Sequence, residues 1–167
     1  WDQVPANVRR HLEQGLQGNL PETPKPGDKA FKNTAYTLIG SNAISVSAIM
    51  KASEALGYEA KLYSDHLCGE ARDEAEKLVI HVKQLIANGI ARPVALVAGG
   101  ETTVTLKGNG RGGRNQEMAL AFACAAEKHG LTGNWTFLSG GTDGRDGPTD
   151  AAGALVVFGP DPPLVAA

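Results

Sequence analysis

Segments typical of strands alternate with helical segments along most of this chain, and this alternation limits its possible folds more than any other feature. Strand-like runs lie at residues 36–39, 58–63, 93–98, 102–106 and 135–138, with another within 151–158. Helical segments lie at residues 43–56, 64–89 and 115–129. The continuously apolar run 93–98 is typical of a strand that is covered on both faces. Alternation of this kind predicts an α/β fold, a three-layer sandwich with a largely parallel or mixed sheet.

Two of the predicted helices differ in their surroundings. Segment 64–89 carries acids in its first turns and apolar residues at helical spacing, so it predicts a long amphipathic helix. Segment 115–129 is rich in alanine and apolar around nearly its whole circumference, which predicts a buried helix.

The N-terminal region differs from the rest in composition. Residues 5–17 predict a short helix, and residues 20–31 contain three prolines and a glycine, which is typical of an extended linker. We therefore expect residues 1–30 to be a helix and linker from a preceding domain, and residues 31–167 to be one α/β domain. The chain does not begin with Met and ends in a proline-rich segment, so we expect a piece of a longer protein, truncated at its C-terminus.

Charge and cysteine content narrow the classes of function. Sixteen basic and 18 acidic side chains give a formal net charge of −2, so no overall field favours nucleic acid or an anionic membrane as a partner. The apolar runs are too short to span a bilayer. Cys68 and Cys124 are far apart and lack metal-ligand spacing, so we expect buried free thiols and a reducing compartment, the cytoplasm.

Residues 108–117, with the sequence GNGRGGRNQE, have the glycine spacing of a dinucleotide-binding loop. Gly108, Gly110 and Gly113 fit G-x-G-x-x-G, and a strand precedes and a helix follows. That fingerprint also requires an acid about 20 residues further on, where this chain has Gly133. The stretch therefore favours a different kind of anion site over a nicotinamide loop.

Two arginines within this stretch indicate what kind of anion site it is. Arg111 and Arg114 can form bidentate bonds to phosphate or carboxylate, and the helix that begins near Asn115 adds its positive end. Gly110, Gly112 and Gly113 expose backbone N–H groups to the same anion. The alternative is a tight turn whose arginines pair with surface acids.

The loop 139–150 places Asp143, Asp146 and Asp150 among glycines. Carboxylates beside an anion site suggest Mg²⁺, with Asp143 and Asp146 as its ligands, because Mg²⁺ takes one or two carboxylates and fills its other positions with water and phosphate. One of them is alternatively a base for a substrate hydroxyl. A purely structural role is also open, because Asp and Gly are common turn residues.

Two further residues complete the predicted site. Glu101 follows two glycines at the end of the most apolar strand, where it either contacts the substrate or neutralises one of the arginines. Asn42 follows Gly40 and Ser41, where it is either an N-cap or a ligand contact. The loops that follow parallel strands gather at one edge of a sheet, so we expect these segments to converge there.

The segments GGETTVTLKGNGRGGRNQEMALAFA and GTDGRDGPTDAAGA closely resemble the signature of the MOFRL domain. This is the C-terminal domain of the glycerate 2-kinase family, whose members are also labelled hydroxypyruvate reductases. The upstream PETPKPGD, IGSN and GEAR are similar to the same family's preceding segments, so the resemblance covers about residues 5 to 158. The family's large N-terminal domain and its tail after DAAGA have no counterpart here.

This resemblance implies an ATP-dependent kinase that converts D-glycerate to phosphoglycerate, with an active site between an N-terminal Rossmann-like domain and this one. The chain would supply the C-terminal half of that site. Two alternatives to a kinase are also compatible with an anion-binding site. They are an NAD(P)H-dependent hydroxypyruvate reductase and a non-catalytic anion-binding domain.

Overall fold

A computed structural model describes residues 1–159, and the chain divides into two compact units between Ile39 and Gly40. The first unit contains helix α1 (Ala6–Leu16) and the 3₁₀ turn η1 (Lys29–Phe31). The proline-containing segment between α1 and η1 has no regular structure, as its composition predicted. The proline-rich end of the chain, residues 160–167, lies outside the described residues.

The predicted strand at residues 36–39 is wrong. Tyr36 and Ile39 are 95% and 94% exposed and belong to no strand. An apolar run becomes a strand only where a neighbouring strand accepts and donates its backbone hydrogen bonds, and the described residues offer this run no such neighbour.

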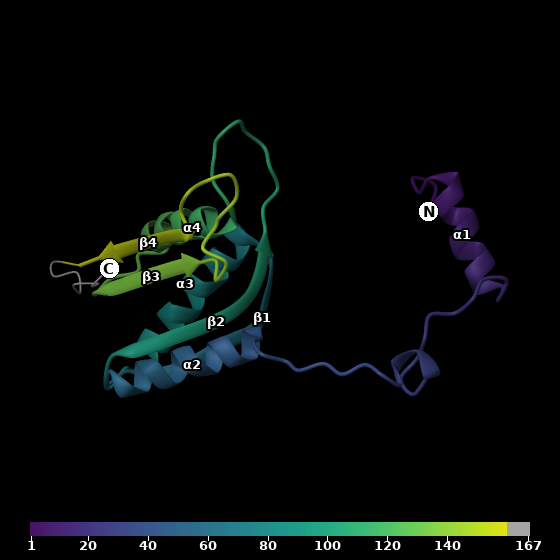
Figure 1. Ribbon diagram of the computed structural model, residues 1–167. Coiled ribbons are helices and arrows are strands. Elements are labelled where there is room, and N and C mark those ends of the chain that lie inside the picture. The colour runs from purple at the N-terminus through teal and green to yellow at the C-terminus, as the bar shows by residue number, and fades with distance from the viewer. Residues whose placement is uncertain (160–167) are drawn as a thin grey trace. The chain divides into compact units, whose positions relative to one another are not determined.

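The second unit begins with three layers. Helix α2 (Asn42–Ala55) is followed by strand β1 (Glu59–Glu70), helix α3 (Ala71–Ala87) and strand β2 (Val94–Thr103). The two strands are parallel, with Glu59 opposite Val94 and Glu70 opposite Thr103. Helices α2 and α3 pack on the two faces of this pair (Figure 1). The α/β class and the position of α2 agree with the sequence prediction. The long helix predicted from residue 64 begins only at Ala71, because the backbone of residues 64–70 pairs with β2 as part of β1.

The remaining elements are helix α4 (Arg114–Lys128) and strands β3 (Trp135–Gly140) and β4 (Gly153–Phe158). Strands β3 and β4 pair antiparallel, with Trp135 opposite Phe158. Helix α4 packs against α3 on one side and against β3 and β4 on the other (Figure 1). Among the described residues the strands therefore form two two-stranded sheets, one parallel and one antiparallel.

The core lies where α3, α4 and β3 meet. Small side chains let the two helices approach closely, and Phe122 of α4 stacks on Phe137 of β3 with ring centroids 4.1 Å apart. The buried cluster comprises Ala71, Ala75, Leu78, Val79, Met118, Phe122, Ala125, Ala126 and Leu131.

Three local expectations need correction. Residues 102–106 are not a separate strand, because β2 ends at Thr103 and the N–H of Thr105 donates to the Glu70 carboxylate at 2.8 Å. Helix α4 is not buried all round, since Leu120 is 67% exposed. Both cysteines are free, as predicted, but both are exposed.

Within residues 1–159, no helix combines the length and the apolar composition that crossing a membrane requires.

Candidate anion site at the start of helix α4

The candidate site lies at one edge of the parallel strand pair. Strands β1 and β2 end at this edge because they are parallel, and α2 begins there because it runs antiparallel to β1. The loops 104–113 and 141–152 lie side by side at the same edge, next to the start of α4 (Figure 1). Segments far apart in the sequence thus meet where open α/β sheets bind their ligands.

Asp146 is the centre of this loop cluster. Its side chain is fully buried, with 0% of the residue exposed. Its Oδ1 accepts hydrogen bonds from the N–H of Asn115 at 3.0 Å and from the Asn115 side-chain amide at 3.1 Å, and its Oδ2 accepts one from the N–H of Gln116 at 2.8 Å. Asp146 therefore binds the N–H groups that the first turn of α4 leaves without a partner inside the helix.

The pKa of Asp146 reflects these hydrogen bonds. Burial alone raises the pKa of this carboxyl, but the hydrogen bonds from the N–H groups of Asn115 and Gln116 outweigh it and hold the pKa below its usual value. Asp146 is consequently ionised at neutral pH.

Further hydrogen bonds hold the loop to the helix. The Ser139 hydroxyl donates to Asn115 Oδ1 at 2.8 Å, and the Gln116 amide donates to Thr149 Oγ1 at 2.9 Å. Thr149 in turn donates its hydroxyl proton to the Asp146 carbonyl at 2.7 Å. Every donor here is matched to an acceptor, which favours a single conformation of the loop.

Two glycines make this close approach possible. A Cβ added at Gly113 would lie 2.3 Å from Asp146 Oδ1. Gly147 has a φ of +59°, and a Cβ there would lie 2.2 Å from the Gly112 carbonyl oxygen. Gly110 and Gly112 have no atom within 4 Å of an added Cβ, so they face open space.

The two predicted arginines flank the start of α4. Arg111 Nη2 donates to the Pro148 carbonyl at 3.0 Å. Arg114, the first residue of α4, lies 3.4 Å from Glu101 Oε1, and 34% of its side chain is exposed against 75% for Glu101. The prediction that Glu101 neutralises one of the arginines is therefore confirmed for Arg114.

A hollow of about 430 Å³ lies beside these residues, lined by Arg111, Pro148, Thr149 and Asp150. Its volume is within the range of small-molecule sites. The hollow places one guanidinium and one exposed carboxylate against the same space.

Asn42 lies at the same edge but in different contacts. Ser41, not Asn42, is the N-cap of α2, because its hydroxyl accepts the N–H of Ile44 at 3.2 Å. The Asn42 amide donates to the Asp65 carbonyl, and a Cβ at Gly99 would collide with Asn42 Oδ1. Among the described residues, no hydrogen bond joins Asn42 to either arginine, so its predicted role in ligand binding stays a prediction.

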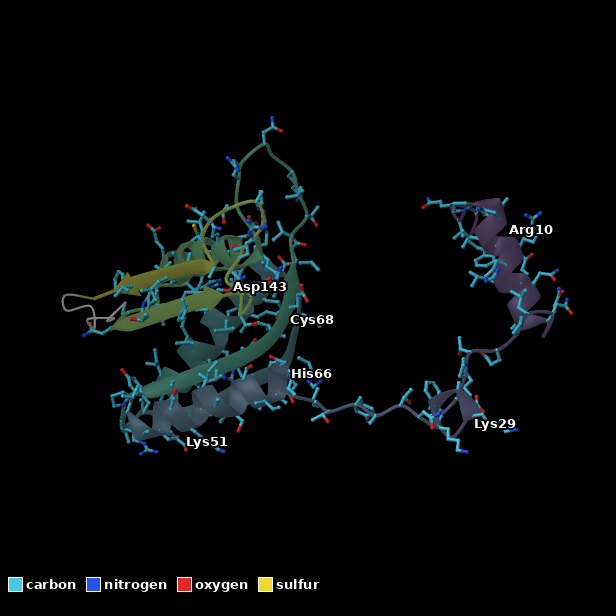
Figure 2. The ribbon with its side chains drawn as sticks, viewed as in Figure 1. Arg10, Lys29, Lys51, His66, Cys68 and Asp143 are labelled. Atoms are coloured by element: carbon cyan, nitrogen blue, oxygen red, sulfur yellow. The ribbon has the colours of Figure 1, made fainter. Side chains whose placement is uncertain are left out.

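The two predicted metal ligands differ in how well they fit a metal. Asp143 is exposed in the loop that follows β3 (Figure 2), and its Oδ1 accepts the Arg145 N–H at 3.2 Å. Asp146 is buried with both oxygens bound to N–H donors, which does not fit a metal ligand. Residues 1–159 contain no cluster of three or more His, Cys, Asp or Glu side chains arranged to hold a metal ion.

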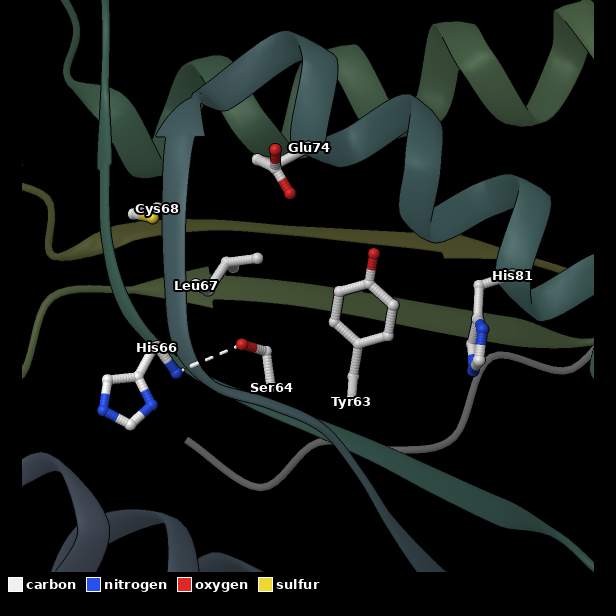
Figure 3. Close-up of a pocket in the computed structure, with 7 residues that line it drawn as sticks. All are labelled: Tyr63, Ser64, His66, Leu67, Cys68, Glu74 and His81. Atoms are coloured by element: carbon white, nitrogen blue, oxygen red, sulfur yellow. Dashed lines mark hydrogen bonds between the residues drawn. The ribbon is translucent and has the colours of Figure 1, made fainter.

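A second hollow, of about 420 Å³, lies between β1 and α3 (Figure 3). The rings of Tyr63 and His81 meet edge to face there, with centroids 5.1 Å apart. Glu74 is buried beside it and accepts a hydrogen bond from Lys77 at 2.7 Å. The residues that line this hollow are Tyr63, Ser64, His66, Leu67, Cys68, Glu74 and His81. This lining has no arginine or lysine, so the hollow beside Arg111 is the better anion site.

Gln116 and Ser139 also belong to the hydrogen-bonded cluster around Asp146 but were not predicted from the sequence. Polar residues next to a predicted helix start and strand end were the available signal, but their partners lie 24 to 33 residues away in the sequence. Local patterns do not identify partners at that distance.

Comparison with known proteins agrees with this architecture. Residues 94–160 match the MOFRL family. A glycerate 2-kinase of Pyrococcus horikoshii is 41% identical over 93% of this chain and 34% of the relative, and a D-glycerate 2-kinase of Thermotoga maritima is 40% identical over 82% of this chain and 32% of the relative. The crystal structure of a Thermotoga maritima glycerate kinase superposes with a TM-score of 0.67 at 35% identity, covering 92% of this chain and 34% of that one.

The fold thus defines an α/β domain with its candidate site at one edge of the parallel strand pair, and residues 94–160 match the MOFRL family. The chain carries a MOFRL-family domain and is homologous to glycerate kinases over most of its length. It spans about a third of the length of these relatives.

Proposed function

We propose that the longer protein to which this chain belongs is an ATP-dependent kinase of D-glycerate, and that this chain supplies the C-terminal half of its active site. The observation that carries the proposal is the pair Arg111 and Arg114 at the start of α4, with an open hollow that Arg111 lines. The names of the relatives support the choice of glycerate as substrate. The other half of the site would come from a Rossmann-like N-terminal domain, in the cytoplasm.

The arginines have the chemistry that phosphoryl transfer needs. Transfer of a phosphoryl group depends on alignment and charge neutralisation more than on covalent steps. Asp146 already occupies the N–H groups at the start of α4, so the anion contacts fall to the guanidinium groups of Arg111 and Arg114, with the N–H groups of Gly110, Gly112 and Gly113 near them. Glu101 and Asn115 would orient these groups from the strand and the helix.

Asp143 is the carboxylate that would contact Mg²⁺, because it is exposed and in the loop next to the arginines. When bound, the ion would neutralise negative charge on the ATP phosphates. Domain organisation follows the same proposal, with residues 1–30 leading from the preceding domain and residues 31–167 forming the MOFRL-like domain.

The test is a coupled ADP-release assay with D-glycerate and Mg-ATP on the longer protein. Arg114→Ala should lower kcat/KM by about 100- to 1000-fold, the usual loss when one preorganised charge-stabilising donor is removed. Arg92→Ala is the matched control, since Arg92 is 61% exposed beside the start of β2, at the opposite edge of the strand pair. A kcat/KM for Arg114→Ala within about threefold of wild type would show that Arg114 does not stabilise the transition state. NADPH oxidation with hydroxypyruvate, without ADP release, would instead indicate a reductase.

A further inference from the structure

We propose that Asp146 is a positioning residue that holds Arg111 and Arg114 in place by capping α4, and that it neither binds metal nor accepts a substrate proton. The role of the two arginines rests on the function proposed above. The capping arrangement itself rests only on the structure.

Asp146 takes the place of the missing helix cap. The N-cap residue of α4 is Gly113, which has no side chain to accept a hydrogen bond. Asp146, from a loop about 30 residues further along the chain, accepts the N–H groups of Asn115 and Gln116 instead. A buried carboxylate at a helix N-terminus also interacts favourably with the helix dipole.

The Asp146 carboxylate has little capacity left for catalysis. One oxygen accepts two hydrogen bonds and the other accepts one, and none of the residue is exposed. A Mg²⁺ ligand must present an oxygen to a hydrated ion, and a general base must reach the proton that it abstracts. Either role would require the loop to leave the helix.

The cap connects both arginines to one rigid unit. Arg114 directly precedes Asn115, whose N–H and side-chain amide Asp146 binds. Arg111 donates to the carbonyl of Pro148, two residues after Asp146. Displacing Asp146 therefore moves the backbone that carries Arg114 and the carbonyl that holds the Arg111 guanidinium, without removing either charge.

The Asp146 carboxylate can approach the start of α4 this closely only because glycines line the contact. Gly113 and Gly147 lie on the two sides of the contact, and an added Cβ at either would collide with the opposite segment. The loop that carries Asp146 and the start of α4 are thus sterically complementary.

The experiment compares Asp146→Asn, Asp143→Asn and Asp73→Asn in the longer protein. The Asn side chain keeps the shape of Asp146 but replaces one acceptor by an NH₂ group facing an N–H donor. We expect Asp146→Asn to lower kcat/KM on the order of 100-fold, the effect of misplacing reacting groups by about 1 Å. Asp73, exposed in the first turn of α3, serves as the unchanged control.

Two readouts separate positioning from metal binding. The affinity for Mn²⁺ in the presence of ADP, measured by electron paramagnetic resonance, should stay within about twofold of wild type in Asp146→Asn and fall about tenfold in Asp143→Asn. Hydrogen exchange at the Asn115 and Gln116 amides should accelerate in Asp146→Asn only. A tenfold loss of Mn²⁺ affinity in Asp146→Asn with unchanged amide exchange would overturn the proposal.

A second variant covers the case in which Asp146→Asn does not fold. Gly113→Ala keeps the carboxylate but pushes it from the helix start, and it should reproduce the kinetic loss and the faster amide exchange. Unchanged exchange and unchanged kcat/KM in this variant would also overturn the proposal. If the wild-type protein shows no glycerate kinase activity, the proposed function fails, while amide exchange and Mn²⁺ affinity still test the role of Asp146.

Discussion

Gly113→Ala should destabilise the second unit although alanine suits the backbone at this position. Gly113 has φ −144° and ψ −176°, an extended conformation that any residue adopts. Restricting the unfolded chain would then by itself stabilise the protein by about 0.4–1 kcal/mol. The new methyl group, however, would lie 2.3 Å from Asp146 Oδ1 and 2.6 Å from the Asp146 carbonyl carbon. Side chain and backbone are both too close, so the loop must move.

The magnitude follows from the hydrogen bonds that this movement breaks. A hydrogen bond to a charged group contributes about 1.5–3 kcal/mol. Losing one of the bonds from the Asn115 and Gln116 N–H groups leaves a net destabilisation of about 0.5–2.6 kcal/mol after the unfolded-state gain. Losing both bonds leaves a net destabilisation of about 2–5.6 kcal/mol. For a chain of this size, each kcal/mol lowers the melting temperature by about 2–4 °C.

Urea unfolding followed by circular dichroism measures this effect, with Gly110→Ala as the matched control. Gly110 lies in the same glycine stretch but has no atom within 4 Å of an added Cβ, and its φ is not positive. Gly110→Ala should therefore be neutral or slightly stabilising. Equal free energies of unfolding for the two variants, within about 0.5 kcal/mol, would refute the close contact between Gly113 and Asp146.

Three further predictions concern pH, the polar network and the core. The pKa of Asp146 is lower in the folded than in the unfolded chain. The contribution of this carboxylate to the free energy of unfolding is therefore complete above its pKa in the unfolded chain, about 3.9, and is lost as the pH falls from there through its pKa in the folded chain. The stability difference between wild type and Asp146→Asn should therefore shrink in acid titrations of urea midpoints, and a difference that grows below pH 4 would contradict this sign. Ser139→Ala removes the hydroxyl that donates to Asn115 Oδ1 and should cost about 1 kcal/mol in urea unfolding, whereas Thr136→Ala, on the exposed side of β3, should change little. Phe122→Ala should lower the free energy of unfolding by about 3–5 kcal/mol in thermal unfolding, because Phe122 is buried and stacked on Phe137. A loss below about 1 kcal/mol would mean that this stack is not part of the core.

The helices were predictable from the sequence because their signals are local. Residues 43–56 were predicted for a helix that the structure places at Asn42–Ala55, and residues 115–129 for one at Arg114–Lys128. Apolar spacing and glycines after the last turn act within a few residues of the helix itself. The prediction of a strand at residues 36–39 was wrong because a strand needs a pairing partner elsewhere in the chain, which local signals do not identify.

The charged residues of the candidate site could be predicted from the sequence, but the hydrogen bonds between its segments could not. The spacing of Arg111 and Arg114 among glycines indicated an anion site, and the parallel strands predicted that Glu101 would meet them at one edge, as the ion pair with Arg114 confirms. By itself, then, the sequence determined the α/β class, the helices and the residues that carry charge. Only the tertiary structure decided that Asp146 caps α4, because a hydrogen-bond partner about 30 residues away is set by how the loops pack and leaves no trace in local spacing.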